Sequence, residues 1–283
     1  MVTTPPRPPL QVQALRYVAL PTPYRHEGED ARAASLRFGQ AVGTAAAPLL
    51  AAHACDDYVL AATLNSPVIS DPAAHQKAFR DEVAASAGRA PAALLNAYEC
   101  IGWALALRYV ALKAAATGQA RRVLMQVVDA DVHGLRATWE TRTYGHARFG
   151  ITSVVLEVAP EAVVEVGVAP VERSMMKFSA LLRQWAQREP QAALAVPFFP
   201  EPARSALHRA IPGLPALPDR HDAYGHCFGS DPWIALGRHS QAANPGAARQ
   251  ERFVVASLAL NGYHGLAAVE LKADADIAVE VVA

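Results

Sequence analysis

Two residues stand where covalent chemistry could begin, Cys100 and His226. Cys100 lies between a polar turn and a long apolar segment, in NAYECIGWALALRYVALKAAATGQ. A cysteine in the first turn of a helix faces unpaired amides and the positive end of the helix dipole, which favour the thiolate over the thiol. Gly102 leaves space for a ligand to approach the sulfur. This pattern predicts that Cys100 is a nucleophile.

A purely structural explanation of Cys100 stays open. Free cysteines are usually small, buried core residues. The carboxylate of Glu99, which directly precedes Cys100, would also raise the pKa of a neighbouring thiol. The sequence alone does not decide between the two interpretations.

His226 lies in a glycine-flanked loop just before an expected helix, in DAYGHCFGSDPWIALGRH. Gly225 and Gly229 permit a tight backbone and the close approach of a substrate. A histidine in such a loop could act as a general base or donate a hydrogen bond to a thioester carbonyl. The alternative is a turn histidine that bonds only to the backbone.

A second loop contributes Gly262 and His264, in LNGYHGLAAVEL. We expect a tight turn from Gly262 to Gly265 between two strands, and such a turn could supply a backbone amide to an oxyanion hole. An ordinary hairpin turn built on Asn-Gly is the alternative.

No metal or redox cofactor is expected. Cys227 beside His226 suggests a metal site, but no second Cys/His pair lies at ligand spacing, and His221 and His239 are too loosely placed to define one. The motifs GxGxxG, GxxxxGK[ST], GxSxG and HExxH are absent, which removes several common enzyme classes.

Composition narrows the remaining classes. The chain has 283 residues, of which 52% are hydrophobic and 18% charged, with a formal net charge of zero. Without a basic block, nucleic-acid binding is not expected. No apolar run reaches the roughly 18 residues of a membrane span. Three scattered cysteines do not form a disulfide framework. We therefore expect a cytoplasmic protein.

Buried strands alternate with helices in both parts of the chain, and each part ends in a predicted hairpin. This predicts a duplicated, layered α/β/α body, with one half at 1–165 and the other at 166–283. A helix over 29–53 is expected to be interrupted near Gly43 and Pro48. The runs 149–159 and 162–171 are expected to pair with each other as a hairpin.

The order of these pieces resembles the thiolase-like superfamily, and within it the β-ketoacyl-acyl-carrier-protein synthase III group. The segment 96–131 matches the family's arrangement of strand, nucleophilic cysteine, helix, Thr-Gly turn and strand. YGHCFGSDPWIAL resembles the segment around the family's active-site asparagine, and FVVASLALNGYHGLAAVEL its glycine-rich closing hairpin. The resemblance implies a five-layer fold, with Cys100 as the nucleophile and an acyl-coenzyme A or acyl-carrier-protein thioester as substrate.

The chain departs from the family at two positions. The family's catalytic histidine sits in a His-Gln-Ala-Asn setting after a strand, whereas AVPFFPEPARSAL here has phenylalanine and proline, and His226 takes the asparagine position. Two hypotheses follow from the resemblance. One is an acyltransferase or condensing protein of fatty-acid, polyketide or other specialised metabolism that is acylated on Cys100 with His226 as base. The other is a catalytically silent subunit of a heterodimeric ketosynthase-like enzyme. A homodimer or heterodimer is implied in either case.

Overall fold

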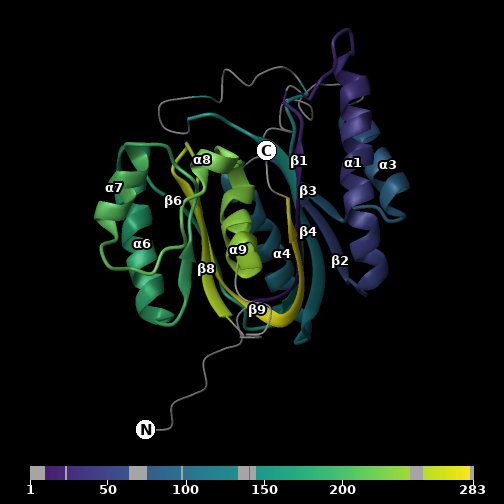
Figure 1. Ribbon diagram of the computed structural model, residues 1–283. Coiled ribbons are helices and arrows are strands. Elements are labelled where there is room, and N and C mark those ends of the chain that lie inside the picture. The colour runs from purple at the N-terminus through teal and green to yellow at the C-terminus, as the bar shows by residue number, and fades with distance from the viewer. Residues whose placement is uncertain are drawn as a thin grey trace.

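In this computed structural model the described residues are 10–22, 24–63, 75–96, 98–132, 140, 145–242 and 251–280. The elements of the first half, labelled as in Figure 1, are β1 (Leu10–Leu20), α1 (Ala31–Ala52), β2 (Asp57–Ala61), α3 (His75–Ala87), β3 (Ala93–Leu95), the short helical turn η1 (Glu99–Ile101), α4 (Gly102–Thr117), β4 (Arg121–Asp129) and β5 (Phe149–Val158).

The second half continues with a similar series. Its elements are β6 (Val164–Val168), the short turn η2 (Val171–Arg173), α6 (Ser174–Arg188), β7 (Ala193–Ala195), α7 (Ala203–Ala210), α8 (His221–Tyr224), the short turn η3 (Phe228–Ser230), α9 (Asp231–Ala242), β8 (Glu251–Leu258) and β9 (Tyr263–Val279).

The strand pairings of the two halves repeat each other. In the first half β2 is parallel to β4, β4 is antiparallel to β5, and β5 is antiparallel to β1. In the second half β7 is parallel to β8, β8 is antiparallel to β9, and β9 is antiparallel to β6. The predicted duplication is therefore present in the backbone, although it is not visible as sequence identity.

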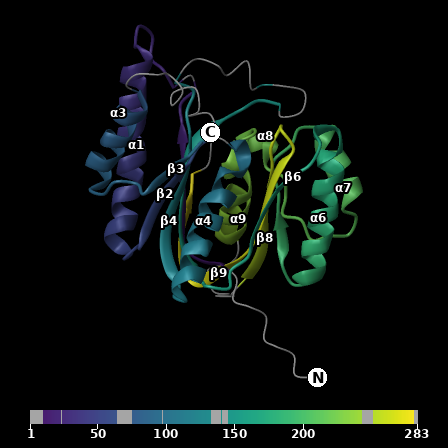
Figure 2. The same cartoon turned by 180° about the vertical axis from the view of Figure 1, so that it is seen from behind.

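The helices cover the two halves of the sheet in layers (Figure 1). Helices α1 and α3 lie on one outer side and α6 and α7 on the other, while α4 and α9 lie between the two halves of the sheet. Seen from behind, α4 lies in front of α9 (Figure 2). The rings of Trp103 on α4 and Trp233 on α9 meet edge-on with centroids 5.4 Å apart, so the two central helices are neighbours. This confirms the predicted layered α/β/α architecture.

The long strand β9 joins the two halves. Its first part pairs with β6, and its later part runs parallel to β1, with Leu10 opposite Val269. The result is one continuous sheet in the order β3-β2-β4-β5-β1-β9-β8-β7. Helices α4 and α9 lie between the two halves of this sheet, and the short turns that precede them, η1 and η3, contact each other.

The expected break in the first helix is wrong. Helix α1 runs without interruption through Gly43 and Pro48. A Cβ on Gly43 would lie 2.6 Å from the Cβ of Ser86, so this glycine allows α1 and α3 to approach closely. Burial of one face of α1 stabilises the helix and outweighs the hydrogen bond that Pro48 cannot donate.

The expected hairpin between 149–159 and 162–171 is also wrong. Strand β5 lies between β1 and β4, and β6 pairs with β9. Each half pairs its last strand with its own first strand, so β5 and β6 belong to different repeats. The five residues from Ala159 to Val163 connect them, and the boundary predicted after residue 165 lies within β6.

By length and composition alone, one helical stretch in the described part of the chain, Glu99–Thr117, could span a membrane. The sequence was not expected to contain such a stretch. Just over half of it is buried, and α4 contacts β4 on one side and β6 on the other. Its apolar character is therefore that of a central core helix, which must be hydrophobic on most of its surface.

Candidate active site

Cys100 lies in a sharp turn at the entrance to α4. The preceding residue, Glu99, has a φ angle of 47°, in the left-handed region that residues other than glycine rarely adopt. This turn directs the Cys100 side chain inward, where it is 5% exposed. A Cβ on Gly102 would lie 3.2 Å from the Cβ of Ala61, so the glycine also lets α4 start close to β2. Strain that persists in a well-packed turn is often associated with a functional site.

His226 reaches the sulfur from the other half of the molecule. Its Nε2 atom lies 3.8 Å from the Sγ atom of Cys100. The imidazole is 1% exposed, and it lies in the loop between α8 and η3. The structure thus brings together the two residues that the sequence singled out, although 126 positions separate them.

Asp231, the first residue of α9, holds the imidazole from the opposite side. Its Oδ2 atom lies 2.6 Å from Nδ1 of His226. The carbonyl oxygen of Phe198 lies 3.2 Å from the same nitrogen. Both neighbours of Nδ1 accept hydrogen bonds, so in the neutral ring Nδ1 carries the proton and Nε2 presents its lone pair to Cys100. Cys100, His226 and Asp231 therefore form a Cys-His-Asp triad.

Backbone amides fix the Asp231 carboxylate in place. Oδ1 accepts a hydrogen bond from the amide of Cys227 at 2.6 Å, and Oδ2 accepts one from the amide of Phe198 at 3.0 Å. These contacts connect the carboxylate to the loop of His226 and to the segment that follows β7. The orientation of the imidazole thus depends on its own loop, on the segment after β7 and on the first residue of α9.

The electrostatics of the site favour the uncharged thiol form of Cys100 in the resting state. Burial raises the pKa of the Cys100 thiol, and the carboxylates of Asp231, Glu99 and Asp129 raise it further. Burial also raises the pKa of Asp231, while His226 acts to lower it. The resting nucleophile is therefore a thiol beside an imidazole, and the imidazole has to take up its proton during the attack.

Aromatic rings surround the imidazole and limit the access of water. The ring of Phe199 stacks on His226 with centroids 6.4 Å apart, and the ring of Phe228 meets it edge-on at 5.0 Å. Phe228 in turn stacks on Phe149. The apolar cluster around the sulfur contains Ile101, Ala147, Phe149, Phe228 and Ala259. Charges that develop in such a low-dielectric site interact strongly with their neighbours.

Gly262 and His264 do not have the positions expected from the sequence. The turn runs over residues 259–262, and His264 is already in β9. The Gly262 amide donates to the carbonyl oxygen of Ala259 within the turn. The donor that was expected to serve an oxyanion hole is thus used by the turn itself.

His264 points away from Cys100. A Cβ on Gly265 would lie near Ile101 and Ala104, so Gly265 faces the central helices. Neighbouring strand residues alternate between the two faces, which places His264 on the α6 side. There its Nε2 lies close to Gly167, and burial lowers the pKa of its imidazole.

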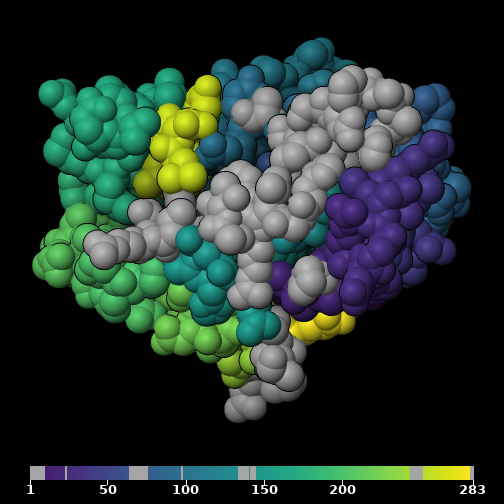
Figure 3. All heavy atoms as spheres, turned by 90° about the horizontal axis from the view of Figure 1, so that it is seen from above, coloured from purple at the N-terminus to yellow at the C-terminus, as the bar shows by residue number. Residues whose placement is uncertain are grey.

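Glu99 connects the nucleophile turn to the β8–β9 turn. Its carboxylate accepts hydrogen bonds from the amide of Leu260 at 2.9 Å and from the side chain of Asn261. Seen from above, the yellow surface at this end of β8 and β9 lies beside the blue surface of the first half (Figure 3). Glu99 therefore positions one half against the other immediately beside Cys100.

Asp231 was not predicted from the sequence to be a member of the site. Asp231-Pro232 was expected only to start a helix, a role that acidic residues often have. The signal that could have found it is the spacing of His226 and Asp231, five positions apart on either side of a turn that precedes a helix.

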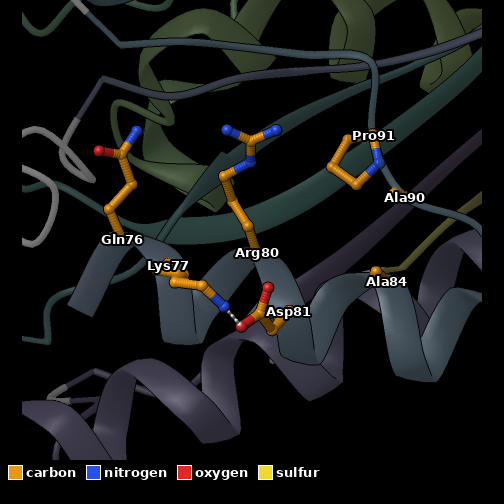
Figure 4. A pocket seen from close by; sticks show the side chains of 7 residues that line it. All are labelled: Gln76, Lys77, Arg80, Asp81, Ala84, Ala90 and Pro91. Atoms are coloured by element: carbon orange, nitrogen blue, oxygen red, sulfur yellow. Dashed lines mark hydrogen bonds and ion pairs between the residues drawn. The ribbon is translucent and has the colours of Figure 1, made fainter. Parts of the chain in front are cut away.

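Other candidate sites are weaker. Within the described ranges no group of three or more His, Cys, Asp or Glu residues could hold a metal ion. A surface groove of about 310 Å³ lies along α3 (Figure 4), which is one of the outer helices. It is lined by Gln76, Lys77, Arg80, Asp81, Ala84, Ala90 and Pro91, and Lys77 pairs with Asp81 across one helical turn.

No protein-family model matches the sequence, and no curated protein does. Solved structures do match it. The 3-oxoacyl-(acyl carrier protein) synthase III FabH from Pseudomonas aeruginosa PAO1 is 15% identical, with a TM-score of 0.60 over 97% of this chain and 100% of that one. The fold is thiolase-like.

Two further structures extend the similarity. The acyltransferase ChlB3 is 13% identical, with a TM-score of 0.66 over 95% of this chain and 99% of that one. The priming β-ketosynthase of the R1128 polyketide pathway is 12% identical, with a TM-score of 0.62 over 96% and 98%. At these identities the similarity establishes the fold alone, and the chemistry of this chain must be inferred from its own residues.

Proposed function

We propose that this protein is an acyltransferase or condensing enzyme that accepts an acyl group on Cys100. The donor would be an acyl-coenzyme A or acyl-carrier-protein thioester, used in fatty-acid, polyketide or other specialised metabolism. The observation that carries the proposal is the 3.8 Å approach of His226 Nε2 to Cys100 Sγ, with Asp231 on the opposite side of the ring.

Acylation begins when His226 Nε2 takes the thiol proton as Sγ attacks the thioester carbonyl. A Cys100–acyl bond forms and the bond from the carbonyl carbon to the donor's sulfur breaks. The donor thiolate then takes the proton from Nε2 and leaves as a thiol. Atoms and charge balance, because one thioester replaces another.

Asp231 stabilises the imidazolium that exists between these two proton transfers. In the resting state it fixes the tautomer in which Nε2 can act as a base. A buried carboxylate beside Nδ1 has both effects in other nucleophile-histidine-acid triads. The second half of the molecule therefore supplies the base together with its orientation.

The silent-subunit hypothesis remains as a second candidate, supported by the burial of Cys100 and its raised pKa. It predicts that the isolated chain is not acylated and that a homologous ketosynthase-like partner is required for activity. A dimer is proposed with either candidate, as a homodimer or as a heterodimer with a ketosynthase-like subunit.

The test is intact-protein mass spectrometry after incubation with acetyl-, butyryl- and octanoyl-coenzyme A. We expect the wild type to gain the mass of one acyl group. Cys100→Ala should gain none. Cys55→Ser should be acylated like the wild type, because the thiol that lies beside His226 is that of Cys100 and not the half-buried thiol of Cys55. Equal adducts on wild type and Cys100→Ala would contradict the proposal.

A further inference from the structure

We infer that the acyl group on Cys100 is passed to an O–H or N–H nucleophile, such as an alcohol, an amine or water, and not to the carbon of a malonyl thioester. This inference rests on the proposed function. It concerns the second half of the reaction, which decides the product: an ester, an amide or a free acid on one side, and a β-ketoacyl thioester on the other.

The base at this site suits an O–H or N–H acceptor. An O–H or N–H acceptor must lose a proton as it attacks the acyl carbonyl, and Nε2 of His226 is placed to take it. Asp231, 2.6 Å from Nδ1, stabilises the imidazolium produced. The same nitrogen that accepted the thiol proton in the first step therefore accepts the acceptor's proton in the second.

The groups next to the sulfur suit an enolate poorly. A malonyl acceptor loses carbon dioxide and leaves an enolate, whose oxygen needs hydrogen-bond donors. With Nδ1 facing Asp231 and the carbonyl oxygen of Phe198, the neutral imidazole ring presents a lone pair at Nε2. Phe149 and Phe228 are the largest members of the apolar cluster that packs with Cys100. Phe198, in the segment after β7, bonds to the triad through its backbone.

Acidic side chains at the site disfavour an anionic acceptor. Asp231 lies 2.6 Å from the imidazole that contacts the sulfur, and Glu99 directly precedes Cys100. A malonyl carboxylate and an enolate are both anions, and like charges repel strongly in a buried site. Neutral alcohols, amines and water are not subject to this repulsion. The same acidic groups stabilise the imidazolium that proton transfer from a neutral acceptor creates.

The step balances without any further reactant. The acceptor oxygen or nitrogen bonds to the acyl carbonyl carbon, and the bond from that carbon to Cys100 Sγ breaks. The acceptor's proton moves to His226 Nε2 and from there to the departing sulfur. Cys100 ends as the thiol with which the cycle began.

The experiment separates the two halves of the reaction. The acyl-enzyme is formed with the coenzyme A ester that labels Cys100, freed of excess donor, and then mixed with buffer alone, 1-butanol, butylamine or malonyl-coenzyme A. Loss of the acyl mass and the identity of the product are followed over time. The same acyl-enzyme unfolded in urea gives the uncatalysed rate for each acceptor.

We expect at least one of water, butanol and butylamine to discharge the folded acyl-enzyme at least about 100-fold faster than the unfolded one, the scale of general base catalysis. Malonyl-coenzyme A should release no carbon dioxide. Formation of a β-ketoacyl product with carbon dioxide would overturn the inference and leave the proposed function intact. Discharge of the folded form only at the unfolded rate with all three O–H and N–H acceptors would also overturn it. Failure of the acyl-enzyme to form refutes the proposed function itself, and the inference with it.

A matched variant sharpens the result. His226→Asn keeps a polar side chain at the site but removes the base. If discharge depends on proton removal, acyl-enzyme made with this variant should lose the rate advantage over the unfolded form. Discharge of the variant at the wild-type rate would contradict the role of His226 in the second half of the reaction.

Discussion

The two halves of the molecule have the same topology and contribute different things to one site. In each half a residue with a positive φ angle precedes the central helix, Glu99 at 47° in the first and Phe228 at 54° in the second. The residue after it is Cys100 in the first half and Gly229 in the second. The repeat thus places a nucleophile in one half and no side chain at the matching position of the other.

The absence of that side chain has a structural cause. A Cβ on Gly229 would lie 3.0 Å from the carbonyl oxygen of Cys100. A side chain there would push the Cys100 carbonyl away by a few tenths of an ångström, so glycine favours the close approach of the two turns. Its own contribution comes from His226 and Asp231, on either side of η3. Duplication supplied two matching turns, and the candidate site forms where they meet.

The strongest way to test this division compares His226 with His264, another buried histidine of the second half. His226→Gln should lower the rate of Cys100 acylation about 100- to 10,000-fold, because the base is lost. His264→Gln should leave the rate unchanged, because His264 faces α6. Stopped-flow or quenched-flow mass analysis gives both rates. Equal losses in the two variants would contradict the assignment of the base.

Gly229→Ala tests the contact between the two turns. The added methyl group requires the Cys100 carbonyl to shift by a few tenths of an ångström. An error of about 1 Å in the position of a reacting atom costs on the order of 100-fold in rate, so we expect this smaller shift to slow acylation by no more than about 10-fold. Gly118→Ala is the control, since nothing lies within 4 Å of the added carbon, and its φ angle of 66° strains an alanine only locally. It should lower the melting temperature without slowing acylation.

The buried thiols of the two halves predict alkaline destabilisation. Burial raises the pKa of both Cys100 and Cys227 well above the usual value. Thiols in the unfolded chain ionise near pH 8.5, so above that pH the unfolded state loses protons that the folded state keeps. Stability should be full below about pH 8.5 and then fall by about 1.4 kcal/mol per pH unit for each thiol.

Thermal or urea unfolding at several pH values measures this loss. Cys227→Ala should remove one of the two thiol contributions and make the decline above about pH 8.5 less steep. A midpoint that stays constant up to about pH 10 in the wild type would show that these thiols titrate normally in the folded protein.

The smallest expected effect is on stability and concerns Glu99, which connects the turn of Cys100 to the β8–β9 turn. Glu99→Ala leaves the Leu260 amide and the Asn261 side chain without their carboxylate acceptor, which should cost about 1–2 kcal/mol of stability. Glu99→Gln keeps one acceptor oxygen and should cost less. Urea midpoints distinguish the two variants. A Glu99→Ala midpoint equal to that of the wild type would show that Glu99 does not stabilise the contact between the halves.

The sequence predicted the layered fold because alternating strands and helices leave few other arrangements. It also predicted the candidate pair Cys100 and His226, since glycine-flanked turns before helices are visible as local patterns. His264 was misplaced because one residue of register decides which face of a strand it occupies. Asp231 was missed because its partner, the imidazole of His226, lies across a turn whose shape depends on the positive φ angle of Phe228.

The false hairpin has a similar explanation. β5 and β6 are adjacent in sequence and both apolar, so local rules pair them. Their actual partners, β1 and β9, are chosen by the long-range closure of each half. Local patterns therefore identified the elements well and their partners less well.

The central claim is that Cys100, His226 and Asp231 act as one unit across the two halves. A double-mutant cycle on the single-turnover rate of Cys100 acylation tests it, with His226→Gln, Asp231→Asn and both together. If Asp231 acts through His226, the double variant should be no slower than His226→Gln alone. Two losses that multiply in the double variant would show that Asp231 acts independently, and the triad would be refuted.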